Sequence, residues 1–485
     1  MKQIGYFIWG FCALFLAACG NEDEPQFPVE QLTLGSSKLF LPMGEEAVLQ
    51  VTVSPEGADQ TVQWSSADAS VVQVDASGVI HPVKVGSTSV IARAGGQQAT
   101  CEVHVVHAVQ RTVLVYMAAD NNLGDYNGTV HFAQNDWEEM KLGMQQVAGR
   151  GSRLLVYKDF RRGLQKPVLM ELIRADDGSM REEVIKTYEE RNSVGVAEMQ
   201  EVFGDVFDNP KFRASSYGLV YWSHGDGWIP FPAPNTRWVG EDAGQGTHRM
   251  NISELVQVLD YIPNLRFDFI LFDACFMQSV EVAYALHPFA DYLIASPTET
   301  PGPGAPYDAI VPYMLVGQEV VGTAEAYYQV YEHMYDEGVG ISNSNWTGGV
   351  SMAVTRLTEM QTLATVTRRC LAEAEAASPE DLRLARLFDY DCRTGRSHVG
   401  YYDFLQLMRK VLPDAPFKEW EAAYNQCMAY WKTTPKNYSG FVGMFSMEGS
   451  HGVTHYIPAS ASGATAAAYR QTDWYQASGL SQLGW

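Results

Sequence analysis

A chain of 485 residues, of which 46% are hydrophobic and 19% charged, is long enough for two or three folded domains. Its formal net charge is −23 at pH 7, with 34 Lys and Arg against 57 Asp and Glu. Because nucleic-acid binding relies on clustered cationic side chains, this balance argues against a nucleic-acid partner.

The first nineteen residues are predicted to be a signal peptide. Lys2 is followed by an apolar stretch, Ile4–Phe15, that is too short to cross a bilayer, and then by the processing site Leu16–Cys19. That tetrapeptide resembles the lipobox of bacterial lipoproteins, which implies that Cys19 carries lipid. A plain secretory signal is the alternative. The acidic Asn21–Glu24 resembles the surface-export signal of Bacteroidetes lipoproteins. We therefore expect a cell-envelope protein, lipid-anchored to the outer membrane through Cys19 and exposed at the surface.

The cysteine count predicts a free thiol. After loss of the signal and lipidation of Cys19, five cysteines remain, which are Cys101, Cys275, Cys370, Cys392 and Cys427. An odd number in an exported protein leaves at least one of them unpaired. Since no Cys-x-x-Cys pair and no Cys/His cluster occurs, no metal-binding set is predicted.

Residues 20–28 are predicted to be a linker and residues 29–107 a domain of short strands. Alternating apolar segments separated by Gly, Ser, Asp and Pro are typical of a β-sandwich. The stretches Val62–Ser66, Val74–Asp75 and Ser77–Val79 resemble the bacterial immunoglobulin-like domains of group 2. This resemblance implies a spacer or adhesive module without catalytic groups.

Residues 110–485 are predicted to form one α/β domain, because strands alternate with amphipathic helices and no linker-like stretch interrupts them. Near-continuous apolar strands indicate a mainly parallel sheet that is buried on both faces. Parallel strands are predicted at Thr112–Met117, Arg153–Lys158, Gly218–Ser223, Phe267–Asp273 and Tyr292–Ala295, helices at 132–147, 252–259, 324–335 and 417–431, and further strands at 350–354 and 441–445.

Two of these strands end on reactive residues, His224 and Cys275. Ligands of open α/β sheets bind beyond the carboxyl ends of the strands, so neighbouring strands would bring imidazole and thiol together. The 51-residue interval matches the histidine-to-cysteine spacing of caspases. A thiolate beside an imidazolium, near a helix expected to begin at Met277, would be a nucleophile with a general acid/base. The N–H groups of Gly225 and Cys275 are predicted to hold an oxyanion.

Four segments, 113–123, 217–228, 267–286 and 292–304, resemble the clostripain family of cysteine peptidases, relatives of caspases, gingipains and legumains. The resemblance begins near Arg111 and is strongest from Tyr217 to Gly304. It implies a caspase-like α/β fold and a catalytic dyad at His224 and Cys275. It also implies that Asp273 lines the primary specificity pocket and pairs with Arg or Lys of the substrate. Capping of a nearby loop is the alternative role for Asp273.

The loop after the strand 292–295 departs from the family pattern, because PTETPGPGAPYD replaces the usual Gly-Trp-x-Tyr element. Glu299 and Asp308 are therefore the candidates for a second pocket acid. Relatives often cut themselves between the histidine and cysteine strands. The turn-rich interval Pro230–Gly246 contains Arg237, which is the predicted processing site, with Arg249 as second choice and an ordinary exposed arginine as the alternative.

The sequence thus predicts a cysteine endopeptidase that cleaves protein or peptide substrates after Arg or Lys. An inactive surface adhesin and a transpeptidase with the same dyad remain open. Serine-hydrolase and zinc-protease motifs are absent. No cofactor is predicted; calcium responsiveness is implied only by the resemblance. The segment Asp120–Asp125 does not fit the EF-hand spacing and is interpreted as a polar lip after the first strand of the sheet.

Overall fold

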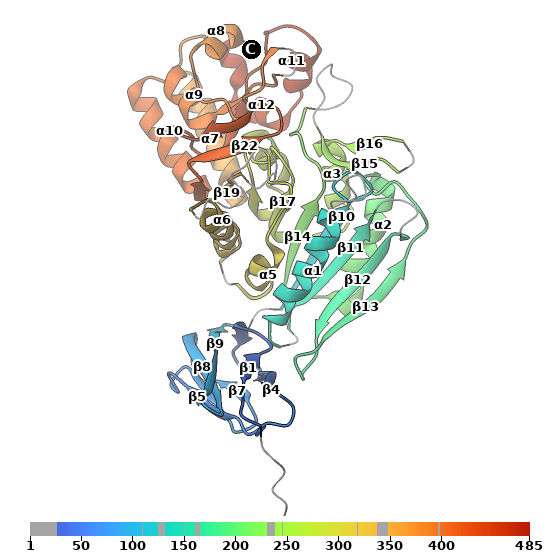
Figure 1. Cartoon of the computed structure of the whole chain (residues 1–485). Helices are drawn as coiled ribbons and strands as arrows, with labels where there is room; N and C mark the ends of the chain where they lie inside the picture. The colour runs from blue at the N-terminus through green and yellow to red at the C-terminus, as the bar shows by residue number, and fades with distance from the viewer. Residues whose placement is uncertain are drawn as a thin grey trace, which may run out of the picture.

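The structure is a computed structural model of the full chain (Figure 1). It describes residues 27–108, 110–124, 131–149, 151–160, 165–229, 238–244, 246–317, 319–336, 348–395 and 398–485. The predicted signal peptide with Cys19 and the predicted processing residue Arg237 lie outside the described residues. No helix in the described ranges is both long and apolar enough to span a membrane.

The N-terminal domain is a β-sandwich, as predicted. Its buried residues alternate along the strands, for example Cys101, Val103 and Val105, because successive side chains of a strand point to opposite faces. The neighbouring strands of the segment 47–54 belong to two different sheets. The strands are β1 (Gln31–Leu34), β2 (Lys38–Pro42), β3 (Ala47–Val48), β4 (Val51–Ser54), β5 (Gln63–Ser66), β6 (Val72–Val74), β7 (Val79–Pro82), β8 (Gly86–Ala94) and β9 (Gln97–Val106).

A nine-stranded sheet organises the second domain, in the order β13-β12-β11-β10-β14-β17-β18-β19-β21. The five inner strands are parallel and coincide with the five predicted ones. Two antiparallel strands flank them at each side. The inner strands are β10 (Arg111–Ala118), β11 (Arg153–Asp159), β14 (Ser216–Trp222), β17 (Phe267–Asp273) and β18 (Ala290–Ala295), and the outer ones are β12 (Val168–Arg174), β13 (Met180–Thr187), β19 (Ser351–Arg356) and β21 (Met428–Thr433).

Helices cover both faces of this sheet. Every residue of β10 is buried, and its side chains contribute alternately to the two cores, with Val115 on one face and Tyr116 on the other. The Val115 face is covered by α1 (Phe132–Gln145), α5 (Tyr307–Val316) and α6 (Val321–Asp336). The Tyr116 face is covered by α2 (Val196–Phe207), α3 (Ile252–Leu259), α4 (Val280–Leu286) and α7 (Met360–Leu371).

The C-terminal elements belong to the same core as α4 and α7. In Figure 1 they lie, in orange to red, at the end of the molecule opposite the blue N-terminal domain. The helix predicted at 417–431 ends at Cys427, and its last residues form edge strand β21 instead. The other elements are β15 (Val239–Asp242), β16 (His248–Met250), α8 (Pro379–Leu384), β20 (Tyr401–Asp403), α9 (Phe404–Val411), α10 (Asp414–Cys427), β22 (Lys436–Ser439), β23 (Gly443–Ser446), β24 (Thr454–Tyr456), α11 (Ala464–Tyr469) and α12 (Asp473–Ser478).

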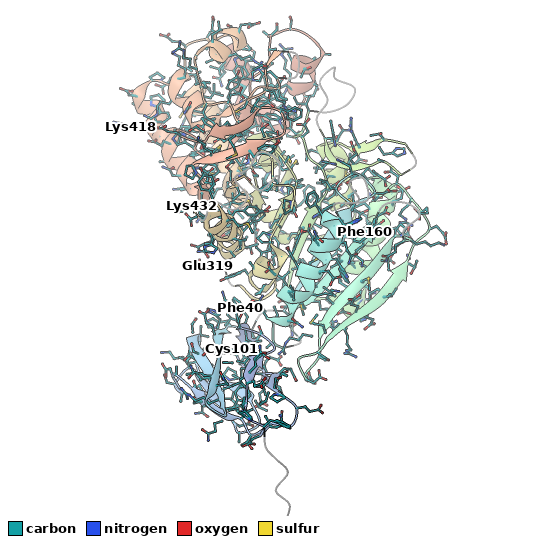
Figure 2. The ribbon with its side chains drawn as sticks, viewed as in Figure 1. Phe40, Cys101, Phe160, Glu319, Lys418 and Lys432 are labelled. Atoms are coloured by element: carbon teal, nitrogen blue, oxygen red, sulfur yellow. The ribbon has the colours of Figure 1, made fainter. Side chains whose placement is uncertain are left out.

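The two domains share a packed boundary at Phe40, which Figure 2 labels between the N-terminal sandwich and the rest of the chain. Its ring packs on Tyr313 of α5 with centroids 5.1 Å apart, and its carbonyl accepts a hydrogen bond of 2.8 Å from the N–H of Ala148. The nearby end of α5 receives hydrogen bonds from the guanidinium of Arg111 at the start of β10. The sandwich therefore docks at the amino ends of the parallel strands, away from their carboxyl ends.

Candidate active site

His224 and Cys275 lie just beyond the carboxyl ends of two adjacent parallel strands. In the register of β14 and β17, Trp222 pairs with Asp273, and each reactive residue follows two positions later. The N–H of Ser223 continues this pairing with a hydrogen bond of 3.4 Å to the carbonyl of Asp273. The two residues predicted from sequence are thus brought side by side by the strand order.

A glycine allows the two loops to approach each other. A Cβ atom at Gly225 would lie 2.7 Å from the carbonyl oxygen of Cys275 and 3.2 Å from its nitrogen, closer than a side chain permits. Gly225 also forms a bridge to Val239, in which the hydrogen bonds of 2.8 and 2.9 Å are made by the flanking residues. The N–H of Gly225 therefore takes no part in this pairing, and the Gly225 backbone lies against that of Cys275.

A cavity of about 340 Å³ opens at this position. All five described cysteines are unpaired, and of these Cys275 lines the cavity. Its walls come from the loops after β10, β14, β17 and β18, from the loop before β20 and from the β22–β23 hairpin. The lining residues are Leu123, Trp222, Ser223, His224, Gly225, Asp226, Trp238, Asp273, Ala274, Cys275, Phe276, Glu299, Thr300, Pro301, Gly302, Gly304, Gly349, Arg393, Tyr438, Gly440 and Phe441.

Asn122 is a third residue of the site that the sequence analysis did not assign. Its Oδ1 lies 2.6 Å from Nε2 of the half-buried His224. The neighbouring Asn121 anchors the loop by donating its amide to the carbonyls of Ala118 and Glu241, at 2.9 Å each. The predicted polar lip after β10 therefore orients the imidazole. Asn122 could have been predicted from its position, because it belongs to the polar residues that directly follow β10, the strand next to β14.

Replacing Asn122 by alanine is expected to lower kcat for peptide hydrolysis by about 10- to 100-fold with little change in KM, since a misoriented imidazole transfers protons poorly. In Asn122→Asp, the added negative charge favours imidazolium and should move the acid limb of the kcat profile to higher pH. Steady-state kinetics across pH measures both effects. Unchanged kcat and pH profile in both variants would contradict an orienting role.

The surroundings of the Cys275 thiol and the His224 imidazole disfavour the charged form of both groups. Burial, together with the negative charges of Glu299, Asp226 and Asp273, raises the pKa of Cys275 to about 12, although the hydrogen bond from Thr300 N–H acts in the opposite direction. Burial also lowers the pKa of His224. Burial therefore acts against the thiolate that an adjacent imidazolium would favour, because buried surroundings disfavour charge on either group.

The helix expected directly after Cys275 begins later than predicted. Helix α4 starts at Val280, and the side chain of Ser279 caps it by accepting a hydrogen bond of 3.1 Å from Val282 N–H. The intervening residues form a turn, in which Phe276 has a positive φ of 60°. Cys275 thus lies in a strand-to-turn segment rather than at a helix N-terminus, so no helix dipole stabilises its thiolate.

Asp273 binds a nearby loop, which is the alternative role considered from the sequence, and it also lines the cavity. Its Oδ2 accepts hydrogen bonds from the N–H of Ala305, at 3.0 Å, and from the hydroxyl of Tyr307, at 3.1 Å. It therefore holds the loop after β18 in place while lining the cavity. Burial raises the pKa of Asp273 to about 6, although these hydrogen bonds act in the opposite direction.

The two candidates for a second pocket acid differ in position. Glu299 lines the cavity, but its carboxylate accepts hydrogen bonds of 2.7 Å from Ser439 Oγ and 2.6 Å from Gly440 N–H, which tie it to the β22–β23 hairpin. Asp308 is exposed and does not line the cavity. The expectation for Asp308 is therefore wrong, because α5 begins at Tyr307 and its first turn directs Asp308 to solvent.

A different carboxylate, that of Asp136, lies next to Asp273. A Cβ atom at Gly304 would lie 2.9 Å from Oδ2 of Asp273 and 3.3 Å from Oδ2 of Asp136. Asp136 also accepts a hydrogen bond of 2.6 Å from Trp222 Nε1. Asp136 was not predicted as a site residue, although a carboxylate on the apolar face of a predicted helix, one turn before Met140, is a signal for such a role.

Arg249, the second-choice processing residue, is held in β16. Its guanidinium pairs with Glu241 at 2.9 Å and stacks on the ring of Trp238 at 3.5 Å from the centroid. A peptide bond in a paired strand is a poor proteolytic site because it has to unfold locally first.

Within the described ranges, ligand-type atoms of Asp389, Asp391 and His398 lie within 4.8 Å of one another. However, the carboxylate of Asp391 is bound by Arg393 and by Val399 N–H, so we assign no metal there.

A parallel sheet that presents histidine and cysteine at adjacent carboxyl ends, beside a cavity with a buried carboxylate, defines the class of caspase-like cysteine peptidases. Comparison with family models agrees with this class. The model of the clostripain family matches residues 115–484, and the model of the bacterial immunoglobulin-like domain (group 2) matches residues 28–103. The chain belongs to the clostripain family.

Solved structures are similar over the same region. A secreted C11 cysteine protease from Bacteroides thetaiotaomicron, in complex with an irreversible peptide inhibitor, is 41% identical, with a TM-score of 0.67 over 76% of this chain and 99% of that chain. An inactive zymogen C11 protease from Parabacteroides distasonis is 27% identical, with a TM-score of 0.63 over 76% of this chain and 98% of that one. The predicted fold class and the class of enzyme, a cysteine-type endopeptidase, are confirmed.

Clostripain from Hathewaya histolytica is 27% identical over 229 residues, which are 42% of this chain and 42% of clostripain. The match therefore spans less than half the length of that relative.

Proposed function

We propose that this protein is a cysteine endopeptidase that cleaves peptide bonds after Arg or Lys, with Cys275 as nucleophile and His224 as general acid/base. The observation that carries the proposal is the register of β14 and β17, which aligns both residues beside a cavity lined by the buried carboxylate of Asp273.

Because the surroundings disfavour charge on both groups of the dyad, general-base attack is favoured. As Sγ of Cys275 bonds to the scissile carbonyl carbon, His224 takes the thiol proton, so no stable thiolate is required. The N–H groups of Gly225 and Cys275 stabilise the oxyanion. His224 then returns the proton to the leaving amine, and a thioester forms. Water, deprotonated by the same imidazole, releases the acid and restores the thiol.

Charge at the cavity favours a cationic substrate side chain. Asp273 forms no ion pair with a described Lys, Arg or His, so an incoming guanidinium or ammonium group would be its first counter-ion. Glu299 and Asp226 also line the cavity, and the guanidinium of Arg393 lies between loops, paired with Asp226 at 2.8 Å. Asp226 is thus paired with Arg393, and Glu299 is bound by Ser439 and Gly440 of the hairpin, so Asp273 is the acid that we assign to the cation of the substrate.

A panel of fluorogenic peptides tests this proposal. Peptides ending in Arg, Lys, citrulline, Asn and Asp, assayed with and without calcium, separate charge from shape, since citrulline matches Arg in size but is neutral. We expect hydrolysis after Arg and Lys and at least ~10²-fold slower hydrolysis after citrulline, as a lost charge-assisted contact implies. Equal rates for Arg and citrulline would contradict a basic preference, and transfer to added amines would reveal transpeptidation.

We further infer that the mature protein is anchored through lipid on Cys19 at the bacterial outer surface. The lipobox-like Leu16–Cys19 and the acidic residues after it support this inference. The sandwich, which follows the predicted linker, docks at the amino ends of the strands, so a substrate would approach the active site from the side away from the anchor.

Cys19→Ala is expected to shift the protein from the membrane fraction to the soluble fraction and to abolish incorporation of labelled fatty acid. A single acyl chain binds membranes weakly, so stable anchoring depends on the several chains that this cysteine would carry. Cys12→Ala, within the signal peptide, is the matched control and should remain in the membrane fraction. Membrane retention and labelling of Cys19→Ala would show that the anchor lies elsewhere.

A further inference from the structure

Two buried carboxylates lie close to Gly304, and neither has a counter-ion among the described residues. Asp136 is 1% exposed and Asp273 5%, and both approach the same side of Gly304. Their hydrogen-bond donors are all neutral, namely the indole of Trp222, the N–H of Ala305 and the hydroxyl of Tyr307. Neither carboxylate forms an ion pair with any Lys, Arg or His in the described residues.

No cationic side chain is among the described groups that act most strongly on Asp136 and Asp273. The groups that act electrostatically on this pair are the phenols of Tyr307, Tyr327 and Tyr331, the carboxyl of Glu139 and the thiol of Cys275. Burial holds the pKa of each phenol well above its ordinary value, so the phenols stay neutral. Two adjacent buried carboxylates in such surroundings cannot both be ionised at low cost.

We propose that Asp136 and Asp273 share one proton in the empty pocket and release it when the cationic side chain of the substrate enters. The proposal rests on the proposed preference for Arg and Lys. Burial and the neighbouring Asp273 raise the pKa of Asp136 well above its ordinary value, which supports a proton held at neutral pH. Because the two sites are coupled, the proton belongs to the pair rather than to one residue.

The exchange is balanced in charge. An O–H bond of the carboxylic acid breaks and its proton passes to the solvent buffer, while the guanidinium or ammonium group donates hydrogen bonds to the carboxylate of Asp273. Asp136 does not line the cavity, but it is hydrogen-bonded to Trp222, which does. It is therefore a positioning residue that sets the charge of Asp273 and thereby the strength of cation recognition.

Calorimetry can count the released proton. In a Cys275→Ala background, which prevents turnover, a peptide with Lys at the cleavage position is titrated at pH 7 in buffers of different ionisation enthalpy. The slope of binding enthalpy against ionisation enthalpy gives the protons released, and we expect a value approaching about one. The norleucine counterpart should bind more weakly and release none.

Two variants identify the group that releases the proton. Asp136→Asn keeps an acceptor for Trp222 but removes a titrating group, so release should fall to near zero and the low-pH limit of Lys-peptide binding should move to lower pH. Glu139→Gln, on the same helix, is the matched control and should keep the release, because Asp308 is the main charge that acts on Glu139 after burial.

The outcomes separate the two proposals. If the Lys peptide binds no better than the norleucine peptide, the proposed basic preference fails. If the Lys peptide binds better but releases no proton, the proposal of a shared proton is wrong, while the basic preference remains supported. The same conclusion follows if Asp136→Asn releases as many protons as the parent protein. If Glu139→Gln alone loses the proton release, the titrating group is Glu139, and the proposal of a proton shared by Asp136 and Asp273 is wrong.

Discussion

Replacing Cys275 by alanine is expected to lower peptide hydrolysis by about 10⁵- to 10⁶-fold, since the covalent route is lost entirely. His224→Ala should cost a similar factor, because residues that act as a unit lose about as much from either deletion. Labelling by a thiol-reactive peptide inhibitor should disappear in Cys275→Ala. Thermal unfolding checks that the variants fold, and Cys392→Ala, at another half-buried thiol lining no part of the cavity, is the matched control.

The same variants test self-processing. If the wild-type protein cuts itself after Arg237, intact-mass analysis finds two fragments that Cys275→Ala lacks, and Arg237→Gln should remain uncut. An uncut, fully active wild type would remove the processing hypothesis. More than trace activity in Cys275→Ala would contradict the dyad, whereas a wild type inactive on every peptide would favour the surface-binding alternative.

Replacing Asp273 by asparagine is expected to lower kcat/KM for Arg and Lys peptides by about 10²- to 10³-fold, because a buried charged contact contributes roughly 2–5 kcal/mol. Asparagine keeps an acceptor for Ala305 N–H and Tyr307, so the loop after β18 should hold its position. Citrulline peptides should lose far less. Equal losses for charged and neutral peptides would point to a folding defect instead of a lost cation site.

Recognition by Asp273 should also depend on pH in a defined direction. Its pKa of about 6 is raised from the ordinary value, so the carboxylate becomes neutral as pH falls through that range. KM for Arg and Lys peptides is therefore expected to rise below about pH 6, while KM for citrulline peptides stays level. Asp273→Asn should abolish this difference between the peptides. A flat KM for Arg peptides down to pH 5 would contradict the assignment.

Local pattern was sufficient to predict the sheet and its reactive ends. Strands such as β10 and β17 are apolar along their whole length, which indicates burial on both faces. A polar residue at the end of such a run marks the point where the strand leaves the core, so His224 and Cys275 could be identified before their neighbours were known. Pattern was less reliable at boundaries, as in the late start of α4 and the early end of α10.

The sequence by itself determined the two domains, the parallel strands and the two reactive residues, because apolar periodicity and chain order carry that information. Only the tertiary structure decided which strands are neighbours and which helix covers the pocket. Asn122 contacts His224, which lies 102 residues later in the chain. Asp136 lies near Asp273, which follows it by 137 residues. Such contacts arise from packing of whole elements on a twisted sheet, so a local pattern can single out a polar residue but cannot name its partner.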